Sequence, residues 1–433
     1  MENATFLPLI SEFYNLNRTA VNADTDRFVE HIKNMLPCTV LEIPSGAECL
    51  TWIVPKRWEV REGYLARLDG TRIVDFNTNP LHLWTHSVSF SGEISRQELE
   101  RHLYSDSAHP DWIPYHYRNG YKYDAEEWGF SLSYNLHQSL GDDRYYVHID
   151  TILDTGGTMK IIDDYIIGES PDTYFFAAHT CHPAIVTDGM APLAVGVELF
   201  KQLHRRKRLK NSYRLILGPE YFAAAGFLAM IPDNQVRLLK GGIFLDMLGN
   251  NQPLGYQTSF QNNSLLDKIV ENVFTHHVPC HIKKTYRKLW GNDEMFYNGP
   301  GFEIPTLGIA GAPHPEYHFD ADNLDLLNCG QLAQSLDILL KIVEVLETDY
   351  IPVRKFNGPL YLSRYGVYVD PKVNPQGYEH IEYIQILMDG KRSCFDISSE
   401  LNIDYFFTKR FCDELIAKGL LAPLCEKGYD KRQ

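Results

Sequence analysis

Four apolar segments of strand length constrain the fold of this chain more than any other feature, because a histidine or a carboxylate follows each of them. Continuous apolar runs of this length are typical of strands buried on both faces of a sheet. In open α/β folds, ligands bind at the edge of the sheet where the strands end. The segments and the polar residues after them are 174–178 with His179, 213–217 with Glu220, 242–245 with Asp246, and 304–309 with His318 further along.

Segments with helical periodicity, such as 191–204 and 331–347, alternate with these strands. This alternation predicts a largely parallel sheet with helices on both faces. A chain of 433 residues is too long for one simple core, so we expect two or three domains. The predicted fold class is α/β, with a small β-rich domain inserted into the main domain and a winged helix-turn-helix at the C-terminus.

The main domain is expected to comprise residues 1–40 and 165–350, because the helical N-terminal segment precedes a change of sequence texture near residue 41. Residues 41–164 carry short alternating runs punctuated by Gly, Asp and Pro, which predict the inserted β-rich domain. Hairpin turns are expected at Asp69-Gly70 and Gly156-Gly157.

Residues 351–433 are expected to form the winged helix, from helices at 381–388, 394–401 and 405–418 and an extended end. The third helix carries a near-neutral mixture of charges, whereas DNA readout needs an excess of basic groups. We therefore favour a packing or dimerisation module over a DNA reader, with a homodimer as the favoured assembly.

Composition excludes several classes of function. The formal net charge of −15 makes nucleic acid an unlikely partner. No apolar run approaches the roughly 20 residues of a membrane helix, and the N-terminus lacks the features of a signal peptide, so a cytoplasmic protein without membrane contact is expected. The eight cysteines, including Cys425, contain no CxxC pair, which favours reduced thiols.

The segment that begins at His179 offers several metal ligands. Neutral imidazole is the commonest zinc ligand, and either His179 or His182, three residues further on, could serve. Cys181 stands where it could orient a metal-bound imidazole, or it could be a buried structural thiol. Asp188 precedes a helix, so it could bind metal, cap the helix, or do both.

Carboxylates at later strand ends complete the candidate site. An acid after a buried strand costs free energy unless it is paired or binds a metal, which applies to Glu220 and Asp246. Glu220 could bind metal or take a proton from a water molecule, as peptide hydrolysis requires. His318 could be a ligand or a surface residue, and Asp322 or Asp320 could orient it.

The segment Gly291-Asn-Asp293-Glu294 supplies two further acidic candidates for substrate binding or support of the metal ligands. Glu294 is the better candidate: it could bind a substrate ammonium group, or it could be a solvated turn acid. Together these residues predict a zinc hydrolase.

The order of these residues resembles that of the co-catalytic zinc aminopeptidases related to bacterial leucyl aminopeptidase. A closer resemblance is to a bacterial group of aminopeptidase-like proteins, many of them associated with polysaccharide or surface-glycan biosynthesis. The motifs that carry it are Ile43-Pro-Ser-Gly46, Trp52-Ile-Val-Pro-Lys-Arg-Trp58, Trp128-Gly-Phe130, His179-Thr-Cys-His-Pro183, Pro219-Glu220, Gly291-Asn-Asp-Glu294 and Glu316-Tyr-His318.

This resemblance implies that His179, Asp188 and His318 bind metal, and that Asp246 matches the last carboxylate ligand. One or two zinc ions per chain are therefore expected. Aminopeptidases carry two adjacent glutamates, one a ligand and the other the general base. This chain has Pro219-Glu220 instead, so one glutamate is left to fill one of the two roles.

Three hypotheses follow. The first is a zinc-dependent hydrolase of amide or peptide bonds, with Glu220 as general base, acting on a small aminoacyl or amino-sugar conjugate or a peptide. The second is a metal-binding but catalytically inactive scaffold or regulatory protein, which the missing second glutamate favours. The third is a zinc-dependent acyl or aminoacyl transferase.

Overall fold

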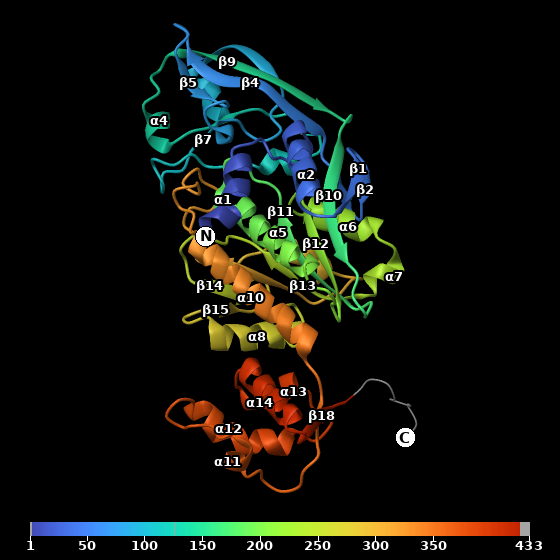
Figure 1. Cartoon of the computed structure of the whole chain (residues 1–433). Coiled ribbons are helices and arrows are strands. Elements are labelled where there is room, and N and C mark those ends of the chain that lie inside the picture. The colour runs from blue at the N-terminus through green and yellow to red at the C-terminus, as the bar shows by residue number, and fades with distance from the viewer. Residues whose placement is uncertain (1, 125, 425–433) are drawn as a thin grey trace. The chain divides into compact units, whose positions relative to one another are not determined.

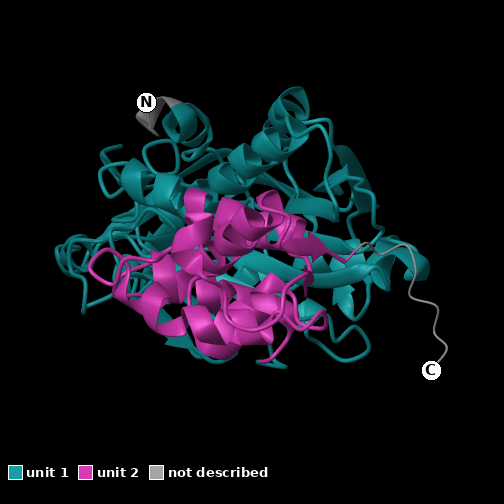
Figure 2. Ribbon diagram, turned by 60° about the horizontal axis from the view of Figure 1, so that its bottom comes forward, with its two compact units in different colours: residues 1–262, 282–336 teal, residues 263–281, 337–433 magenta. Residues whose placement is uncertain are grey.

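The computed structural model describes residues 2–124 and 126–424, which divide into two compact units. The first unit comprises residues 1–262 and 282–336, and the second comprises residues 263–281 and 337–433 (Figure 2). The division falls inside helix α10 (Cys329–Thr348). Residues 425–433 of the predicted winged-helix domain, with Cys425, lie outside the described residues.

The first unit is built around a mixed sheet of eight strands in the order β1-β10-β12-β11-β13-β16-β14-β15 (Figure 1). Its four central strands, from β12 to β16, are parallel to one another, and antiparallel strands flank them. The strands, in sheet order, are β1 (Thr39–Pro44), β10 (Thr158–Ile166), β12 (Ser212–Gly218), β11 (Thr173–His179), β13 (Leu239–Leu245), β16 (Thr306–Gly311), β14 (Leu254–Gln257) and β15 (Ile282–Lys284).

Helices cover both faces of this sheet. Successive side chains of a strand point to opposite faces, so neighbouring residues of one strand pack against different helices. Phe176 of β11 packs edge-on against Phe200 of α5 (Ala191–His204) on one face. On the other face, Phe175 shares a buried apolar cluster with Phe227 of α6 (Phe222–Met230). The N-terminal helices α1 (Glu2–Phe13) and α2 (Ala23–Met35) belong to the same unit.

A second sheet in this unit has the strand order β5-β4-β9-β6 and its own buried core, which includes Trp58 and Tyr145. Its strands are β4 (Arg57–Arg67), β5 (Arg72–Asp75), β6 (Phe90–Ser95) and β9 (Arg144–Asp154). The short strands are β2 (Glu48–Cys49), β3 (Trp52–Ile53), β7 (Leu103–Tyr104) and β8 (Phe130–Ser131). Between these elements run the short helices α3 (Arg96–Leu99) and α4 (Tyr134–Gln138) and a helical turn, Arg118–Tyr121.

One turn prediction is confirmed and one is wrong. The turn at Asp69-Gly70 joins β4 and β5, which pair antiparallel. The expected hairpin at Gly156-Gly157 does not form, because the two strands beside it enter different sheets: β9 pairs with β4 and β6, whereas β10 pairs with β1 and β12. The glycines mark the crossing from the inserted sheet to the large sheet.

The second unit is mainly helical. It contains α8 (Leu265–His277), α11 (Leu362–Tyr365), α12 (Pro375–Leu387), α13 (Cys394–Leu401), α14 (Tyr405–Ala417) and the antiparallel pair β17 (Pro352–Arg354) and β18 (Leu421–Pro423). The three helices expected in the tail are confirmed, although the first begins at Pro375, six residues before its predicted start, and the extended end is β18. Their assignment as a winged helix stays a prediction.

Two further observations concern the whole described chain. None of its helices combines the length and the apolar character that would be needed to span a membrane. No disulfide joins the seven cysteines in residues 2–124 and 126–424, as expected from their spacing. The remaining short helices are α7 (Asp233–Val236) and α9 (Glu294–Tyr297).

The close packing of β11 against β13 gives a prediction for stability. Gly242 of β13 faces the ring of Phe175, and an added Cβ would lie 2.1 Å from its nearest ring atom. Gly242→Ala is therefore expected to lower the free energy of unfolding by roughly 1–3 kcal/mol, as overpacking of a core does. Gly92→Ala in β6 is the control, because its added Cβ would meet no atom closer than 3.9 Å. Equal urea midpoints for the two variants would contradict the prediction.

Candidate metal centre

The carboxyl edge of the central strands gathers the predicted site residues. His179 is the last residue of β11, Glu220 lies two residues after β12, and Asp246 directly follows β13. Asp188 lies in the turn of residues 186–190 that leads into α5, and His318 lies in the loop after β16. All five are within the first unit, and the first four are buried.

Three side chains that lie close together at this edge each present a buried polar atom with no hydrogen-bond partner among the described residues: Nε2 of His182, Oδ2 of Asp188 and Nε2 of His318. The carboxylate oxygen lies 3.8 Å from Nε2 of His182 and 3.4 Å from Nε2 of His318. Each such atom costs about 1–3 kcal/mol if it stays unsatisfied. Two imidazoles and a carboxylate are also a usual set of zinc ligands, so this trio fits a metal ion.

His179 lies beside the trio but has protein partners on both ring nitrogens. Its Nδ1 is 2.5 Å from the carbonyl oxygen of Cys181, and its Nε2 is 3.1 Å from Asp188 Oδ1 and 3.2 Å from Asp246 Oδ1. Burial lowers the pKa of His179, but the two carboxylates outweigh it and raise the pKa well above its usual range. The imidazolium form of His179 thus links Asp188 to Asp246. These three residues also lie close enough together to form a second candidate set of ligands.

Burial sets the protonation state of the trio. It lowers the pKa of His182 well below the usual range, and the nearby His318 and His179 add to the effect. It also lowers the pKa of His318 to about 3. Burial raises the pKa of Asp188 to about 7, against the opposing contact with His179. The two imidazoles are therefore neutral at neutral pH, which is the form that binds metal.

Glu220 stands next to the trio and is held from the inserted segment. Its Oε2 is 3.9 Å from His182 Nε2 and accepts a 2.9 Å hydrogen bond from the hydroxyl of Tyr121. The backbone N–H of Glu220 donates to the sulfur of Cys181 over 3.4 Å. Burial raises the pKa of Glu220, which makes its carboxylate a stronger base.

Arg18 holds the loop that carries His182. This fully buried guanidinium donates to the backbone carbonyls of Thr180, His182 and Ile185, with a distance of 2.5 Å to His182. Burial lowers the pKa of Arg18 to about 10, so it stays charged at neutral pH. Because a cation binds the carbonyl groups on both sides of His182, the position of its imidazole depends on Arg18.

Removing these contacts is expected to loosen the metal centre. Arg18→Met keeps much of the side-chain volume but removes every donor, so we expect zinc affinity to fall by about 10- to 100-fold, as for the loss of other groups that orient ligands. The matched control is Arg214→Met, which removes a buried guanidinium bound to Asp163 and Gln235 away from the centre. Chelator competition on both variants checks this, and equal zinc affinity in the two would contradict it.

The loop that carries Asp188 is held by Asp322. The two carboxylate oxygens of Asp322 accept hydrogen bonds from the backbone N–H groups of Thr187 and Asp188, over 2.8 and 2.9 Å. His314 contacts the same carboxylate over 3.2 Å. Asp188 does not cap α5, whose first turn has no side-chain cap. Asp322 therefore supports the backbone of this loop, and its contacts do not reach the His318 ring.

Aromatic groups and the inserted segment hold His318. Its ring stacks on Tyr317 with centroids 3.8 Å apart and meets Tyr115 and Tyr117 edge-on. The backbone N–H of Tyr115 donates to the carbonyl oxygen of His318 over 2.8 Å. Asp320 accepts a hydrogen bond from the backbone N–H of Ile113. Segment 113–121 of the insertion thus lies against the candidate metal centre.

Asn292 connects the acidic pair to the site. Its Nδ2 donates to Asp246 Oδ2 over 2.9 Å, and its backbone N–H donates to Glu294 Oε2 over 2.7 Å. The other oxygen of Glu294 pairs with Arg287, and Asp293 accepts from the backbone N–H of Tyr221. Burial raises the pKa of both acids to about 8. Both side chains are engaged inside the protein, where they support Asn292 and Tyr221.

Several residues of the site were not predicted from the sequence. They are Arg18, Tyr115, Tyr117, Tyr121, Asn292 and His314. Asn292 could have been found from the motif that contains Asp293 and Glu294, and His314 from its place near His318. The tyrosines and Arg18 carry no local signal, since their partners lie about 100 or more residues away.

Comparison with known structures places this architecture among aminopeptidases. A crystal structure described as a peptidase from Clostridium acetobutylicum superimposes with a TM-score of 0.85 and 26% identity, covering 96% of this chain and 95% of that one. A zinc aminopeptidase from Bacillus subtilis gives a TM-score of 0.58 and 12% identity over 80% of this chain and 94% of that one. The aminopeptidase from Aneurinibacillus sp. strain AM-1 gives a TM-score of 0.51 and 15% identity, covering 79% of this chain and 93% of that one. The last two likenesses show the fold alone.

Sequence comparison agrees with the structural comparison. A protein of Clostridium acetobutylicum, named as a polysaccharide biosynthesis protein with an aminopeptidase-like domain, is 28% identical over 95% of each chain. The resemblance to aminopeptidase-like proteins is therefore confirmed. Residues 7–349 match one family over most of the chain, and the protein belongs to that family, described as "Domain of unknown function (DUF4910)".

Proposed function

We propose that this protein is a zinc-dependent, aminopeptidase-like hydrolase of amide bonds that acts on a small aminoacyl or amino-sugar conjugate. The observation that carries the proposal is the convergence of three unpartnered buried ligand atoms, on His182, Asp188 and His318, beside the carboxylate of Glu220. A zinc ion held by these three residues supplies Lewis acidity toward a scissile carbonyl group.

The residues around the ion have separate roles in this proposal. Glu220 accepts a proton from the attacking water at Oε2 and returns it to the leaving nitrogen, as a general base and then a general acid. Tyr121 holds that oxygen in place through its hydroxyl group. Asn292 donates to Asp246, Asp246 holds His179, and His179 in turn orients Asp188.

We infer one zinc ion per chain, bound through His182. The alternative set of His179, Asp188 and Asp246 lies close enough together for a second ion. However, the hydrogen bonds of His179 already use both of its ring nitrogens. The single glutamate at Pro219-Glu220, in place of the adjacent pair of aminopeptidases, agrees with one ion.

Elemental analysis and an activity panel test the proposal together. The purified full chain is stripped with a chelator, supplied with zinc, and assayed for zinc content, thermal stability and release of amine from aminoacyl amides. We expect about one zinc per chain, a melting temperature that rises with zinc concentration, and zinc-dependent release of amine. A chain that takes up no zinc, or that takes up zinc without cleaving any member of a broad panel, would overturn the proposal.

A further inference from the structure

A large cavity adjoins the metal centre on the side of the inserted segment. It has a volume of about 640 Å³, and a smaller cavity of about 40 Å³ beside it is lined by His182 and Glu220. The two cavities share five lining residues, which are His86, Tyr117, Gly120, Tyr121 and Phe222. A group in the large cavity therefore lies next to whatever is bound at Glu220.

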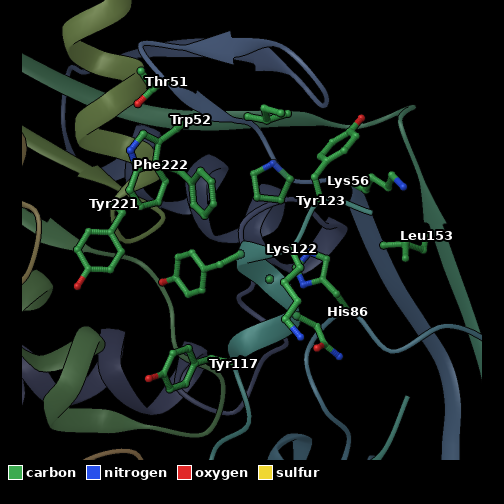
Figure 3. A pocket seen from close by; sticks show the side chains of 15 residues that line it. Thr51, Trp52, Lys56, His86, Tyr117, Lys122, Tyr123, Leu153, Tyr221 and Phe222 are labelled. Atoms are coloured by element: carbon green, nitrogen blue, oxygen red, sulfur yellow. The ribbon is translucent and has the colours of Figure 1, made fainter. Parts of the chain in front are cut away.

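Aromatic side chains dominate the lining of the large cavity. In the view of Figure 3, Trp52, Tyr221 and Phe222 gather on one side, while Tyr123 lies on the other. Trp52 and Tyr221 have ring centroids 5.7 Å apart, and Phe222 meets Trp52 edge-on. Such a surface accepts the face of a ring, either aromatic or sugar, and excludes water from it.

The charged side chains at the cavity are cations. Lys56 and Lys122 line it, and no Asp or Glu is among the fifteen described residues that do so. Lys56 lies over the ring of Tyr123 at 4.9 Å and 3.7 Å from Asp124, and Lys122 lies 3.3 Å from Glu127. These exposed ion pairs are weak, so an anionic ligand can replace them. Because the lining itself carries two ammonium groups and no carboxylate, the cavity favours an anion over a cation.

A buried imidazole also lines this space. His86 is 5% exposed, lines both cavities, and has no hydrogen-bond partner for either ring nitrogen among the described residues. Burial lowers the pKa of His86 to about 4, against a smaller opposite effect of the Lys56 backbone. At neutral pH the ring is uncharged, so it can donate one hydrogen bond and accept one. A ligand with polar atoms would satisfy this side chain.

We propose that the large cavity binds the part of the substrate that is joined to the scissile amide, and that this part is a ring bearing an anionic group such as a phosphate or carboxylate. The ring lies against Trp52 and Tyr221, the anion is drawn to Lys56 and Lys122, and His86 bonds a polar atom of the ligand. This inference rests on the proposed function for its connection to catalysis. It differs from recognition of a free substrate ammonium, because the carboxylate of Glu294 is paired with Arg287.

Binding to the metal-free full chain tests the cavity separately from catalysis, and it prevents a phosphate from binding zinc. The probes are phenyl phosphate and glucose 1-phosphate, with benzyl alcohol and methyl glucoside as neutral counterparts and inorganic phosphate as the anion alone. Titration calorimetry is expected to show each ring phosphate binding about tenfold or more tightly than its neutral counterpart and than inorganic phosphate, with affinity falling as salt rises.

Variants of the two lysines locate the binding. Lys56→Gln and Lys122→Gln are each expected to lower the affinity for the ring phosphates about three- to tenfold. The affinity for the neutral probes is expected to stay unchanged. Lys201→Gln is the matched control, because the two lysines have similar surroundings. The Lys201 side chain is 28% exposed and its Nζ lies 3.6 Å from Glu198. The Lys56 side chain is 25% exposed and its Nζ lies 3.7 Å from Asp124. Lys201→Gln is expected to leave the affinity for every probe unchanged.

The outcomes separate the two proposals. The proposal that the ligand is anionic would be overturned by equal affinity for charged and neutral probes. Equal effects of Lys56→Gln and Lys201→Gln on binding of the ring phosphates would overturn it too. If inorganic phosphate bound as tightly as the ring phosphates, the proposal that the ligand contains a ring would be overturned. Tighter binding of phenyl phosphate or of glucose 1-phosphate identifies the ring as aromatic or sugar. Selective binding by a chain that hydrolyses no amide would leave the cavity assignment standing while the proposed hydrolase fails.

Discussion

Glu220→Gln is expected to lower turnover of amide substrates by about 10²- to 10⁴-fold, the usual contribution of a positioned general base. Glutamine retains the size of the side chain and an oxygen that can accept the hydrogen bond of Tyr121, but it cannot take a proton from water. Zinc content is expected to stay at the wild-type level, because the trio of His182, Asp188 and His318 is intact. Steady-state kinetics together with elemental analysis check both parts.

A second buried acid provides the control for this variant. Glu294→Gln also removes a carboxylate from the interior, but its side chain lines neither cavity at the site and contacts Arg287 and Asn292. We expect it to retain most of the turnover. If Glu220→Gln kept full activity, or lost activity only together with zinc, Glu220 would be excluded as the general base.

His182→Ala is expected to remove zinc from the centre. It deletes a ligand atom itself, so the loss of affinity should exceed the roughly 10- to 100-fold cost of losing a group that only orients a ligand. At a zinc concentration that saturates the wild type, the variant should hold well below one zinc per chain. Its fold should persist, because Arg18 contacts the backbone carbonyl of His182 and not its ring.

His179→Gln is the comparison that identifies the ligand. In the proposed arrangement His179 bonds Asp188 and Asp246 but leaves the metal to His182, so this variant should keep its zinc with reduced affinity. If His179→Gln lost its zinc and His182→Ala kept it, His179 and not His182 would be the ligand. Two zinc ions per wild-type chain would show that both sets bind metal.

Much of the fold was predictable because strand and helix periodicity are local properties of a chain. Helix 191–204 was predicted with its observed bounds, and the strands ending near His179, Glu220 and Asp246 were found within a few residues. The hairpin at Gly156-Gly157 failed because a glycine pair shows only that the chain turns. Whether the strands on either side then pair depends on which sheet each of them joins.

The sequence by itself determined that acids and histidines meet at the carboxyl edge of a buried sheet, since polar residues directly after apolar strands can lie nowhere else. It left open whether His179 or His182 faces the metal. Our proposal of His182 rests on the tertiary structure: the loop held by Arg18 presents Nε2 of His182 without a hydrogen-bond partner, while Nε2 of His179 contacts two carboxylates. Tyr121 and the aromatic cavity likewise depended on the folded chain, because the contacts that define them join segments that are far apart in sequence.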